Sequence, residues 1–495
     1  MKFIHDLLDY TVQNVSDKIA ILTKTQKITY KELQEKSIQF SNLLQEKGVV
    51  KGDRVLLMVS NRIELAYSII GISRVGGVAV VINTEIPPEK LNYIIGDCSP
   101  KLLIYETEEF ELQNTIKLNK ISLMYLKEII TDYASILNSS INLIDLKFND
   151  IALIIYTSGS TGNPKGVISN HCSVLFCTKT ISQVIKINQD DLIGNFLPLS
   201  FDYGLYQLFL TLYNKATLML GNSDLSGVSL VRFLEKWEIT IFPSMPHLTK
   251  ALIKLLNRSK KELSLRLITS TGEYFPEKDI MDLQKILPHC EIYSMYGLTE
   301  CKRVSILRPC ELNHKSKSVG RPLPNVECHV IDKLGNKLKE GMVGQLVVKG
   351  PNVMNGYWGD TELTNEKFKS YSGNSRDTLF TGDLFKIDLD GYLYFIGRMN
   401  DIYKQNGYRI SCKEIEDSVY EINLGDKAVL IPPDEHYRKS RLYVRSRHSS
   451  QFIKKKLKTV LERYKIPDEV IPITEFPITI NGKIDKVKLK KIKEY

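Results

Sequence analysis

The chain is short of several features that would assign it quickly to a class of protein. It has two tryptophans and eight cysteines in 495 residues, and no two cysteines form a Cys-x-x-Cys pair typical of zinc or dithiol sites. Its most apolar region, residues 64–81, is interrupted by Arg74 and by glycines, so it is too short to cross a bilayer. Acidic side chains within the first ten residues exclude a typical secretion signal. We therefore expect reduced thiols, no membrane span and a cytoplasmic location.

Length and charge set further limits. A chain of 495 residues with 43% hydrophobic content is expected to fold into more than one domain with sizeable cores. The net charge is +10, and residues 451–495 contribute twelve Lys or Arg against six Asp or Glu. This basic segment could dock an acidic partner such as a carrier protein, could bind nucleic acid, or could be a solvated lysine-rich face. Because no nucleic-acid-binding motif accompanies it, we expect no nucleic-acid partner.

Hydrophobic patterning in the first part of the chain alternates between helix and strand. Residues 28–48 form an amphipathic helical pattern, 53–59 a strand, 65–73 a helix, and 78–82 a second strand. Such alternation favours an α/β architecture with parallel strands. Residues 320–394 are richer in glycine turns and strand patterns, and a small α+β region is expected after them.

A loop rich in hydroxyl and glycine residues follows the apolar run at 151–155, which predicts a buried strand. Residues 156–166 (YTSGSTGNPKG) contain four Ser or Thr, three Gly and Lys165. Glycines let backbone N–H groups approach an anion closely, and hydroxyl groups and a lysine add donors and charge. The loop suits nucleotide phosphates, although it does not have the spacing of a Walker A loop.

The same loop resembles the signature of the AMP-forming adenylating enzymes, which include acyl-CoA synthetases, adenylation domains of non-ribosomal peptide synthetases and firefly luciferase. Further matches follow in the family's order along nearly all 495 residues. The resemblance implies a large N-terminal domain, residues 1–396, of mixed and parallel sheets flanked by helices with a β-rich subdomain. A hinge at 397–401 and a small, mobile α+β C-terminal domain at 402–495 complete the expected fold.

Enzymes of this kind join a carboxylate to the α-phosphorus of ATP, with Mg²⁺, and release pyrophosphate. A thiol then attacks the acyl-adenylate and AMP leaves. Catalysis of this type depends on positioning and on neutralising phosphate charge. The resemblance assigns to the nucleotide site Thr157, Ser158, Gly159, Ser160, Thr161, Gly162, Lys165, Gly272, Glu273, Tyr296, Gly297, Asp383 and Arg398.

The segment at 295–300 (MYGLTE) resembles a second family motif that carries three parts of the chemistry. By this resemblance Tyr296 stacks on adenine, Thr299 donates to the α-phosphate, and Glu300 holds Mg²⁺. A carboxylate oxygen is the kind of hard ligand that Mg²⁺ prefers. Thr299 and Glu300 are therefore candidate catalytic residues.

Three later motifs complete the resemblance. Asp383, in FTGDL at 380–384, is expected to accept both ribose hydroxyls, and Arg398 follows in a Gly-Arg pair. Asn400 occupies the hinge position, where Asp or Lys is more usual. The segment 407–411 resembles the loop that enters the site for thiol transfer. Lys483, in INGKID at 480–485, is expected to bridge the carboxylate and the α-phosphate and is the main catalytic candidate.

The acid pocket is predicted from Phe201-Asp202, where many fatty and aryl acid ligases have a histidine. The pattern is closest to stand-alone amino-acid adenylation domains, in which the Asp binds the substrate's ammonium. A buried Asp202 needs a cation, which could be that ammonium or Arg303. Arg303 could equally bind an acidic group of the substrate. The expected lining comprises Asp202, Tyr203, Tyr206, Thr271, Met295, Arg303 and Val304, with Pro243 and Thr269.

Three functions remain open from the sequence. We expect a stand-alone ligase for a small carboxylic acid, most simply an amino acid. It would pass the acyl group to the phosphopantetheine thiol of an acyl or peptidyl carrier protein in trans, since no carrier domain follows Tyr495. The alternative is an AMP-forming acyl-CoA ligase for a non-amino acid. A non-catalytic relative is disfavoured because Lys165, Glu300 and Lys483 are all present.

Overall fold

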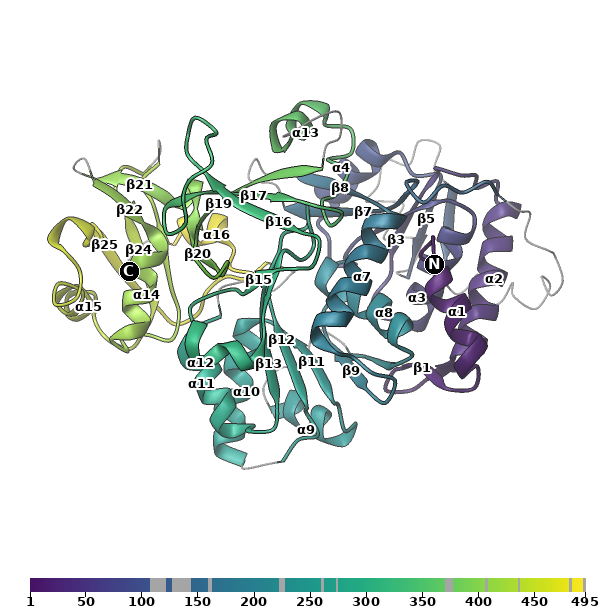
Figure 1. Cartoon of the computed structure of the whole chain (residues 1–495), viewed down its shortest axis with the longest axis horizontal. Helices are drawn as coiled ribbons and strands as arrows, with labels where there is room; N and C mark the ends of the chain where they lie inside the picture. Colours follow the sequence, from purple (N-terminus) through teal and green to yellow (C-terminus); the bar gives the residue numbers. More distant parts are fainter. Residues whose placement is uncertain are drawn as a thin grey trace. The chain divides into compact units, whose positions relative to one another are not determined.

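The structure is a computed structural model, and it divides into two compact units. The first unit comprises residues 1–327 and 348–379, and the second comprises 328–347 and 380–495 (Figure 1). The predicted hinge at 397–401 and the boundaries set by it stay predictions. The structure describes residues 1–106, 122–126, 144–158, 163–221, 228–259, 262–272, 275–369, 377–405, 408–434, 437–479 and 483–492.

A six-stranded sheet of the first unit carries the hydroxyl-rich loop. Its order is β6-β5-β3-β4-β7-β8, and all pairs are parallel except the final antiparallel hairpin. The strands predicted at 53–59, 78–82 and 151–155 are confirmed as β3, β4 and β7. The strands are β3 Arg54–Met58, β4 Val78–Val81, β5 Leu102–Tyr105, β6 Ser122–Tyr125, β7 Ile151–Ser158 and β8 Pro164–Asn170.

A nine-stranded sheet forms the rest of the first unit's framework, in the order β15-β14-β13-β12-β11-β9-β10-β1-β2. The strands from β13 to β1 are parallel, and antiparallel strands close both edges. The strands are β1 Ile19–Leu22, β2 Lys27–Thr29, β9 Leu192–Asn195, β10 Thr217–Leu220, β11 Ile241–Ser244, β12 Leu267–Ser270, β13 Glu291–Tyr296, β14 Ser305–Leu307 and β15 Arg321–Pro322.

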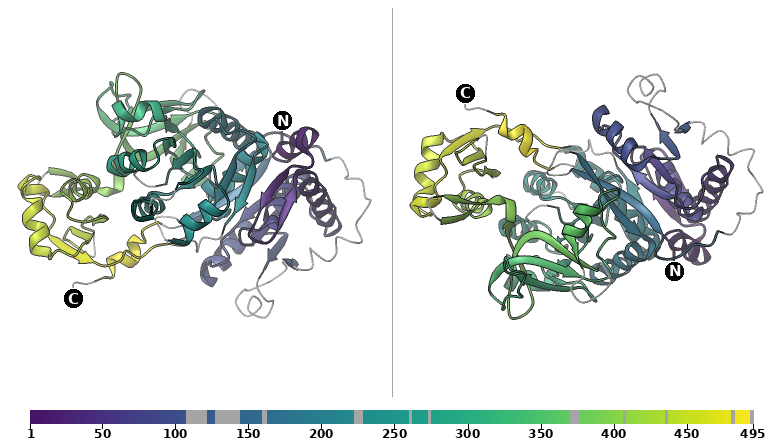
Figure 2. Two further views of the ribbon diagram at one scale, coloured as in Figure 1. Left: turned by 90° about the horizontal axis from the view of Figure 1, so that it is seen from below. Right: turned by 90° about the horizontal axis from the view of Figure 1, so that it is seen from above.

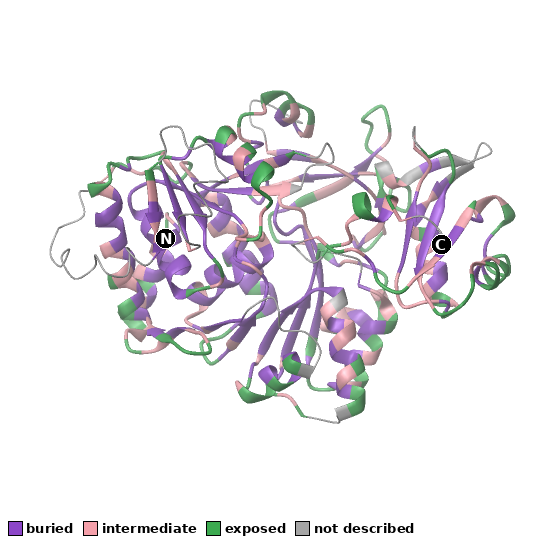
Figure 3. Ribbon diagram, turned by 180° about the vertical axis from the view of Figure 1, so that it is seen from behind, coloured by how far each residue is buried: buried purple, intermediate pink, exposed green. Residues whose placement is uncertain are grey.

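Helices flank these sheets, as the views in Figure 2 show, and Figure 3 shows that the strands between them are mostly buried. Local sequence explains several helix starts: Thr29 and Glu32 form a reciprocal capping box at the start of the second helix. The first unit's helices are α1 Asp6–Val15, α2 Tyr30–Glu46, α3 Ile63–Arg74, α4 Pro88–Cys98, α7 His171–Ile185, α8 Asp202–Asn214, α9 Val228–Lys236, α10 Pro246–Ser259, α11 Glu277–Ile286, η1 Pro309–Glu311, α12 Leu312–Lys315 and α13 Thr361–Lys367.

The β-rich region predicted for residues 320–394 is confirmed as a five-stranded sheet. Its path is β16-β17-β19-β18, and β20 pairs with β19 in antiparallel register. Asp383 faces Arg398 across that pair. The strands are β16 Glu327–Ile331, β17 Val343–Lys349, β18 Phe368–Lys369, β19 Thr378–Ile387 and β20 Leu393–Arg398.

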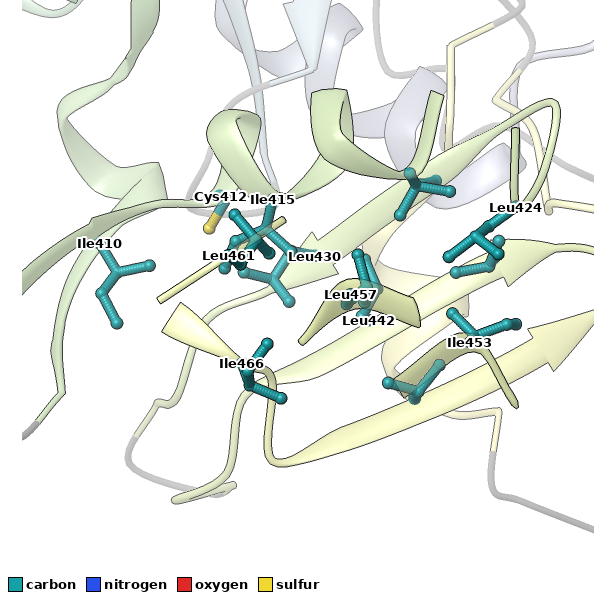
Figure 4. Packing of buried hydrophobic residues seen from close by; sticks show 14 of the residues in the cluster. Ile410, Cys412, Ile415, Leu424, Leu430, Leu442, Ile453, Leu457, Leu461 and Ile466 are labelled. Atoms are coloured by element: carbon teal, nitrogen blue, oxygen red, sulfur yellow. The ribbon is translucent and has the colours of Figure 1, made fainter. Parts of the chain in front are cut away.

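The end of the second unit is the small α+β region expected from the sequence. Its core gathers Cys412, Ile415, Leu430, Leu442 and other buried apolar side chains between helix and sheet (Figure 4). Cys412 is thus a buried small side chain. The elements are η2 Met399–Asp401, β21 Ile402–Gln405, β22 Tyr408–Ser411, α14 Cys412–Glu421, β23 Ala428–Ile431, β24 Arg441–Arg445, α15 Ser450–Leu457, η3 Arg463–Lys465, β25 Glu469–Ile473 and α16 Lys486–Lys490.

Together the sheets and their flanking helices confirm the expected α/β class. Within the described residues, no helix combines the length and the apolarity that crossing a bilayer requires.

Candidate active site

The hydroxyl-rich loop connects the two strands of the β7–β8 hairpin. Thr157 pairs with Lys165, and Ser158 with Pro164, in antiparallel register. The hairpin therefore holds Thr157, Ser158 and Lys165 beside one another at its tip. The predicted nucleotide residues Gly159, Ser160, Thr161, Gly162 and Glu273 lie outside the described residues.

Tyr357 connects this hairpin to the MYGLTE segment. Its ring lies 6.0 Å from the Lys165 ammonium, and its hydroxyl donates a hydrogen bond of 2.7 Å to Glu300 Oε1. The backbone of Tyr357 also forms an antiparallel bridge with Val167 of β8. Burial, and then the charge of Glu300, raise the pKa of Tyr357, so its hydroxyl keeps its proton and remains a donor. Lys165 and Glu300 therefore belong to one local arrangement.

A tight turn follows β13 and presents the predicted catalytic residues. Tyr296 ends the strand and is buried, and its carbonyl accepts a hydrogen bond of 2.9 Å from Val304 N. A Cβ atom at Gly297 would lie 1.9 Å from the Lys302 carbonyl oxygen, so only glycine fits there. Thr299 and Glu300 emerge from the turn half-buried. Because β11, β12 and β13 are parallel, their carboxyl ends meet at one edge, where α/β proteins bind ligands.

A small cavity of about 10 Å³, room for about one water molecule, lies within the first unit at the predicted acid pocket. Of the predicted residues, Tyr203, Tyr206, Met295 and Arg303 line it, as does Thr269. The other predicted residues, Thr271, Asp202, Val304 and Pro243, are not in the lining. The other lining residues are Ile181, Ile185, Gln207, Leu210 and Ile241.

The polar groups of this cavity are held by few contacts. Arg303 Nη1 donates to Thr271 Oγ1 at 2.7 Å, and the guanidinium lies 5.3 Å from the Tyr203 ring. The Tyr203 hydroxyl is 2.6 Å from Thr269 Oγ1. Burial raises the pKa of Tyr203 to about 12, against the opposing charge of Arg303. Both tyrosines of the lining therefore stay neutral at ordinary pH, because burial also raises the pKa of Tyr206.

Asp202 begins α8 and is half-buried. Its Oδ1 accepts a hydrogen bond of 2.9 Å from Tyr203 N. Among the residues that the structure describes, no ion pair within 4.0 Å joins Asp202 to Arg303 or to Lys302. The alternative in which an Asp202–Arg303 pair closes the pocket is therefore not the arrangement observed. Gly204 allows the start of α8 to pack closely, because its Cβ would lie 2.3 Å from the Pro198 carbonyl oxygen.

The remaining predicted residues belong to the second unit. Asp383 is 3% exposed, and its Oδ1 lies 3.5 Å from Arg398 Nε across the β19–β20 pair. Lys483 is exposed, and its backbone N–H donates to Thr479 Oγ1 at 3.2 Å. Residues 480–482 and 406–407 of the two C-terminal motifs lie outside the described residues.

Sequence patterns missed two residues of this site. Tyr357 lies 57 positions from its partner Glu300, and its only sequence signal is the aromatic pair Tyr357-Trp358 after a glycine. Lys302 lies two positions after the MYGLTE motif but is 5% exposed, an unusual burial for a lysine. Nothing in its sequence context distinguishes it from an exposed lysine.

The comparisons with known proteins agree with this site. A family model described as AMP-binding enzyme matches residues 8–358. Zwittermicin A synthase ZmaJ of Bacillus cereus is 30% identical over 98% of this chain and 94% of its own length. Bacitracin synthase 1 of Bacillus licheniformis is 29% identical over 99% of this chain, but this match spans only 9% of that much longer protein.

Solved structures show the same likeness. A complex of VinN with L-aspartate is 30% identical, with a TM-score of 0.73 over 80% of this chain and 98% of VinN. ATP-bound MatB from Rhodopseudomonas palustris, 23% identical, has a TM-score of 0.87 over 98% of each chain and so shares the fold. With the site geometry and the family match over residues 8–358, these findings establish that the chain is a member of the AMP-binding enzyme family, whose members are AMP-forming acid–thiol ligases.

Proposed function

We propose that this adenylating enzyme activates an amino acid with ATP and Mg²⁺ and transfers it to the phosphopantetheine thiol of a carrier protein in trans. The observation that carries the amino-acid assignment is Asp202. Asp202 comes immediately before Tyr203, which lines the cavity. Among the described residues, the Asp202 carboxylate forms no ion pair with Arg303. A carboxylate without a fixed counter-ion suits a substrate ammonium. The L-aspartate complex of VinN supports the same assignment, since that relative is 30% identical.

In this proposal the nucleotide occupies the region around Tyr357. Thr157, Ser158 and Lys165, which the hairpin register brings together, contact phosphate oxygens. Tyr296 stacks on adenine, beside Gly297 and the turn at Gly272, whose φ of +91° suits glycine. Glu273, Asp383 and Arg398 are assigned to the nucleotide by the same resemblance, with Asp383 as the ribose acceptor.

Glu300 fits a magnesium ligand. Its Oε1 accepts from Tyr357, and within the described chain no hydrogen bond occupies Oε2. Mg²⁺ typically binds to one or two carboxylates, water and substrate phosphates, so a single protein carboxylate suffices. When bound there, the ion would neutralise phosphate charge. Tyr357 then sets the orientation of the Glu300 carboxylate.

The first half-reaction transfers the adenylyl group to the acid. A carboxylate oxygen bonds to the α-phosphorus of ATP while the bond to the pyrophosphate oxygen breaks. Negative charge increases on the phosphoryl oxygens, and Lys165, Thr299 and Lys483 are the donors that we assign to them. In the second half-reaction the thiol sulfur bonds to the acyl carbon, AMP leaves, and the thiol proton passes to solvent or to a base.

The first experiment is release of pyrophosphate with Mg²⁺ and ATP across the twenty amino acids and a set of short fatty and aryl acids. We expect an amino acid to be the best substrate. Lys483→Ala should lower the rate roughly 10²–10³-fold. Lys488→Ala, at a side chain that is 70% exposed on α16, is the matched control and should leave the rate unchanged. A best substrate without an amino group would contradict the assignment of Asp202.

A second candidate is an acyl-CoA ligase for a non-amino acid. The observation that favours it is electrostatic: Asp202 attracts both Lys302 and Arg303, and could balance their charge without an ammonium. Thioester formation with coenzyme A and with a phosphopantetheinylated carrier protein separates the two acceptors. Asp202→Asn should impair activity with amino acids under the first proposal. Under the second, turnover of the amine-free acid should survive the same change.

A further inference from the structure

Two consecutive residues near the acid cavity, Lys302 and Arg303, carry buried cations. Lys302 is 5% exposed and Arg303 is 6% exposed. Among the described residues, Lys302 Nζ and Arg303 Nε have no hydrogen-bond partner. Removing a cation from water without a partner is costly, so a protein that keeps two such groups needs an anion for them.

Arg303 belongs to the cavity lining, and Lys302 lies close to one of the residues that line it. Arg303 lines it, fixed on one side by Thr271 Oγ1 at 2.7 Å. The Lys302 ammonium lies 5.9 Å from the ring of Tyr206, which also lines the cavity. The Tyr206 hydroxyl is also buried, and the Cys177 thiol lies beside it. Arg303 and Tyr206 thus line one small space, and the buried Lys302 ammonium lies beside the Tyr206 ring.

The backbone here is built to hold this arrangement. Lys302 has a φ of +51°, an unfavourable value for a residue with a side chain. The fully buried Asn352 clamps the segment, because its Nδ2 donates to Cys301 O at 3.1 Å and to Arg303 O at 3.0 Å. Strain of this kind persists only where surrounding contacts impose it, and it is concentrated at functional sites. The inward placement of Lys302 and Arg303 is therefore enforced by the fold.

The charges at the cavity do not balance once an amino acid binds. Asp202 attracts Lys302 and Arg303, and Glu300 also attracts Lys302. If Asp202 binds the substrate ammonium, the ammonium offsets the attraction of Asp202 for Lys302 and Arg303. An additional negative group on the substrate would restore the balance.

We propose that the acid activated by this enzyme carries a second carboxylate, which Arg303 and Lys302 bind, so that the substrate is an amino dicarboxylic acid. This inference rests on the proposed adenylating function and adds the substrate class. Arg303 supplies its free Nε–H, Lys302 a point charge, and the Tyr206 hydroxyl a third donor. The other carboxylate reacts at the α-phosphorus of ATP, and the ammonium binds to Asp202.

The test compares acids with their matched amides in pyrophosphate release: L-aspartate with L-asparagine, and L-glutamate with L-glutamine. Because an amide cannot replace the charge, we expect kcat/KM for one acid to exceed that of its amide at least 100-fold. In Arg303→Gln and Lys302→Met, the acid-to-amide ratio should fall at least tenfold. The melting temperature and the Kd for AMP show whether each variant is folded.

A binding measurement makes the test independent of turnover. Sulfamoyl adenosines that carry an aspartyl or an asparaginyl group mimic the two acyl-adenylates. Their Kd values should also differ at least 100-fold. Arg303→Gln should remove that difference. Equal Kd values for both analogues would overturn the inference even if no acid released pyrophosphate.

The outcomes also separate this inference from the proposed function. A best substrate with an uncharged side chain overturns the second carboxylate but leaves amino-acid activation standing. Preference for succinate or glutarate over every amino acid supports the second carboxylate and contradicts the role of Asp202. Absence of pyrophosphate release with all acids contradicts the proposed function, and the Kd comparison then decides the inference alone.

Discussion

Single side chains define much of the nucleotide region, and Tyr357 is the most connected of them. It contacts the Lys165 ammonium with its ring and Glu300 with its hydroxyl. One residue thus holds together the side chains that we assign to phosphate and to Mg²⁺. A phenolic hydroxyl suits this position because its raised pKa keeps the proton in place throughout the usual assay range.

Tyr357→Phe should therefore lower the rate of pyrophosphate release about tenfold, since a hydrogen bond to a charged group typically contributes roughly 1.5–3 kcal/mol. The Mg²⁺ concentration needed for half-maximal rate should rise, because the Glu300 carboxylate loses its orientation. Tyr293→Phe is the matched control: Tyr293 donates to Glu291 at 3.0 Å on the same strand. An unchanged Mg²⁺ dependence in Tyr357→Phe would contradict the role of Tyr357.

Sequence patterns predicted the residue types of the site better than its contacts. Tyr203, Tyr206, Met295 and Arg303 line one cavity, and their role in binding the substrate stays a prediction. The burial of Lys302 was not predictable, because lysine side chains are usually exposed. Which distant groups contact one another depends on tertiary packing, and one sequence carries no direct record of it.

Among the helices, strands and turns, the turn after β13 is the most constrained. The close approach of Gly297 to the Lys302 carbonyl involves backbone on both sides, so no side-chain movement can relieve a clash. Gly297→Ala should lower the free energy of unfolding by roughly 3 kcal/mol or more, and should reduce activity as the turn shifts.

Gly96→Ala is a useful comparison for this prediction. Gly96 lies in α4, and a Cβ there would meet nothing within 4 Å. An alanine in a helix is favoured over glycine by up to about 1 kcal/mol, so the melting temperature should rise slightly. If Gly297→Ala were as stable as Gly96→Ala, the described geometry of the turn would be wrong.

Helix α14 carries a pH-dependent contribution to stability. Burial raises the pKa of Glu416 to about 7, although Leu430 N donates to its Oε1 at 2.8 Å and Lys486 and Lys413 oppose the rise. The folded carboxyl binds its proton more tightly than the unfolded one, whose ordinary pKa is about 4.5. Glu416 therefore makes stability fall as pH rises from about 4.5 through 7.

Glu416→Gln should remove this dependence, because a glutamine has the same shape and keeps an acceptor for Leu430 N. Melting curves at pH 5 and pH 8 measure the effect. At pH 8 the variant should be more stable than the natural chain, and at pH 5 the two should be closer. A larger gap at pH 5 would show that the sign is wrong.

The order of strands in the sheets lay beyond what local patterns predict. Residues 53–59, 78–82 and 151–155 showed the right strand periodicity, and all three are strands. The pairing of β1 with β10, however, joins residues almost 200 positions apart. Local hydrophobic periodicity indicates which face of a strand is buried but not which strand lies beside it.

The distribution of exposed lysines indicates where a carrier protein, the proposed acceptor of the acyl group, would bind. Helix α15 presents Lys454, Lys455 and Lys456, and Lys458 follows it. Lys454 Nζ already donates to Asp468 O at 2.8 Å, whereas Lys455 and Lys458 are exposed. These two lysines are the best candidates for contact with an acidic carrier protein.

Reversing both charges, Lys455→Glu with Lys458→Glu, should raise the KM for a carrier protein about tenfold and weaken its dependence on salt. Pyrophosphate release without the carrier should not change, because neither residue belongs to the proposed acid or nucleotide site. Reversal of Lys31 and Lys47, exposed lysines at either end of α2, is the control. If both double reversals changed the KM for the carrier protein equally, the basic segment would have no specific role in binding it.

All eight cysteines are free thiols, and five of them (Cys98, Cys177, Cys290, Cys301 and Cys412) are buried. Because an alkylating reagent reaches such a thiol only when its surroundings open, each is a reporter already present in the natural chain. Cys177 belongs to the first compact unit and Cys412 to the core of the second. Peptide mass spectrometry after timed alkylation would therefore show, without any introduced label, which unit opens first on heating and whether bound ATP delays it.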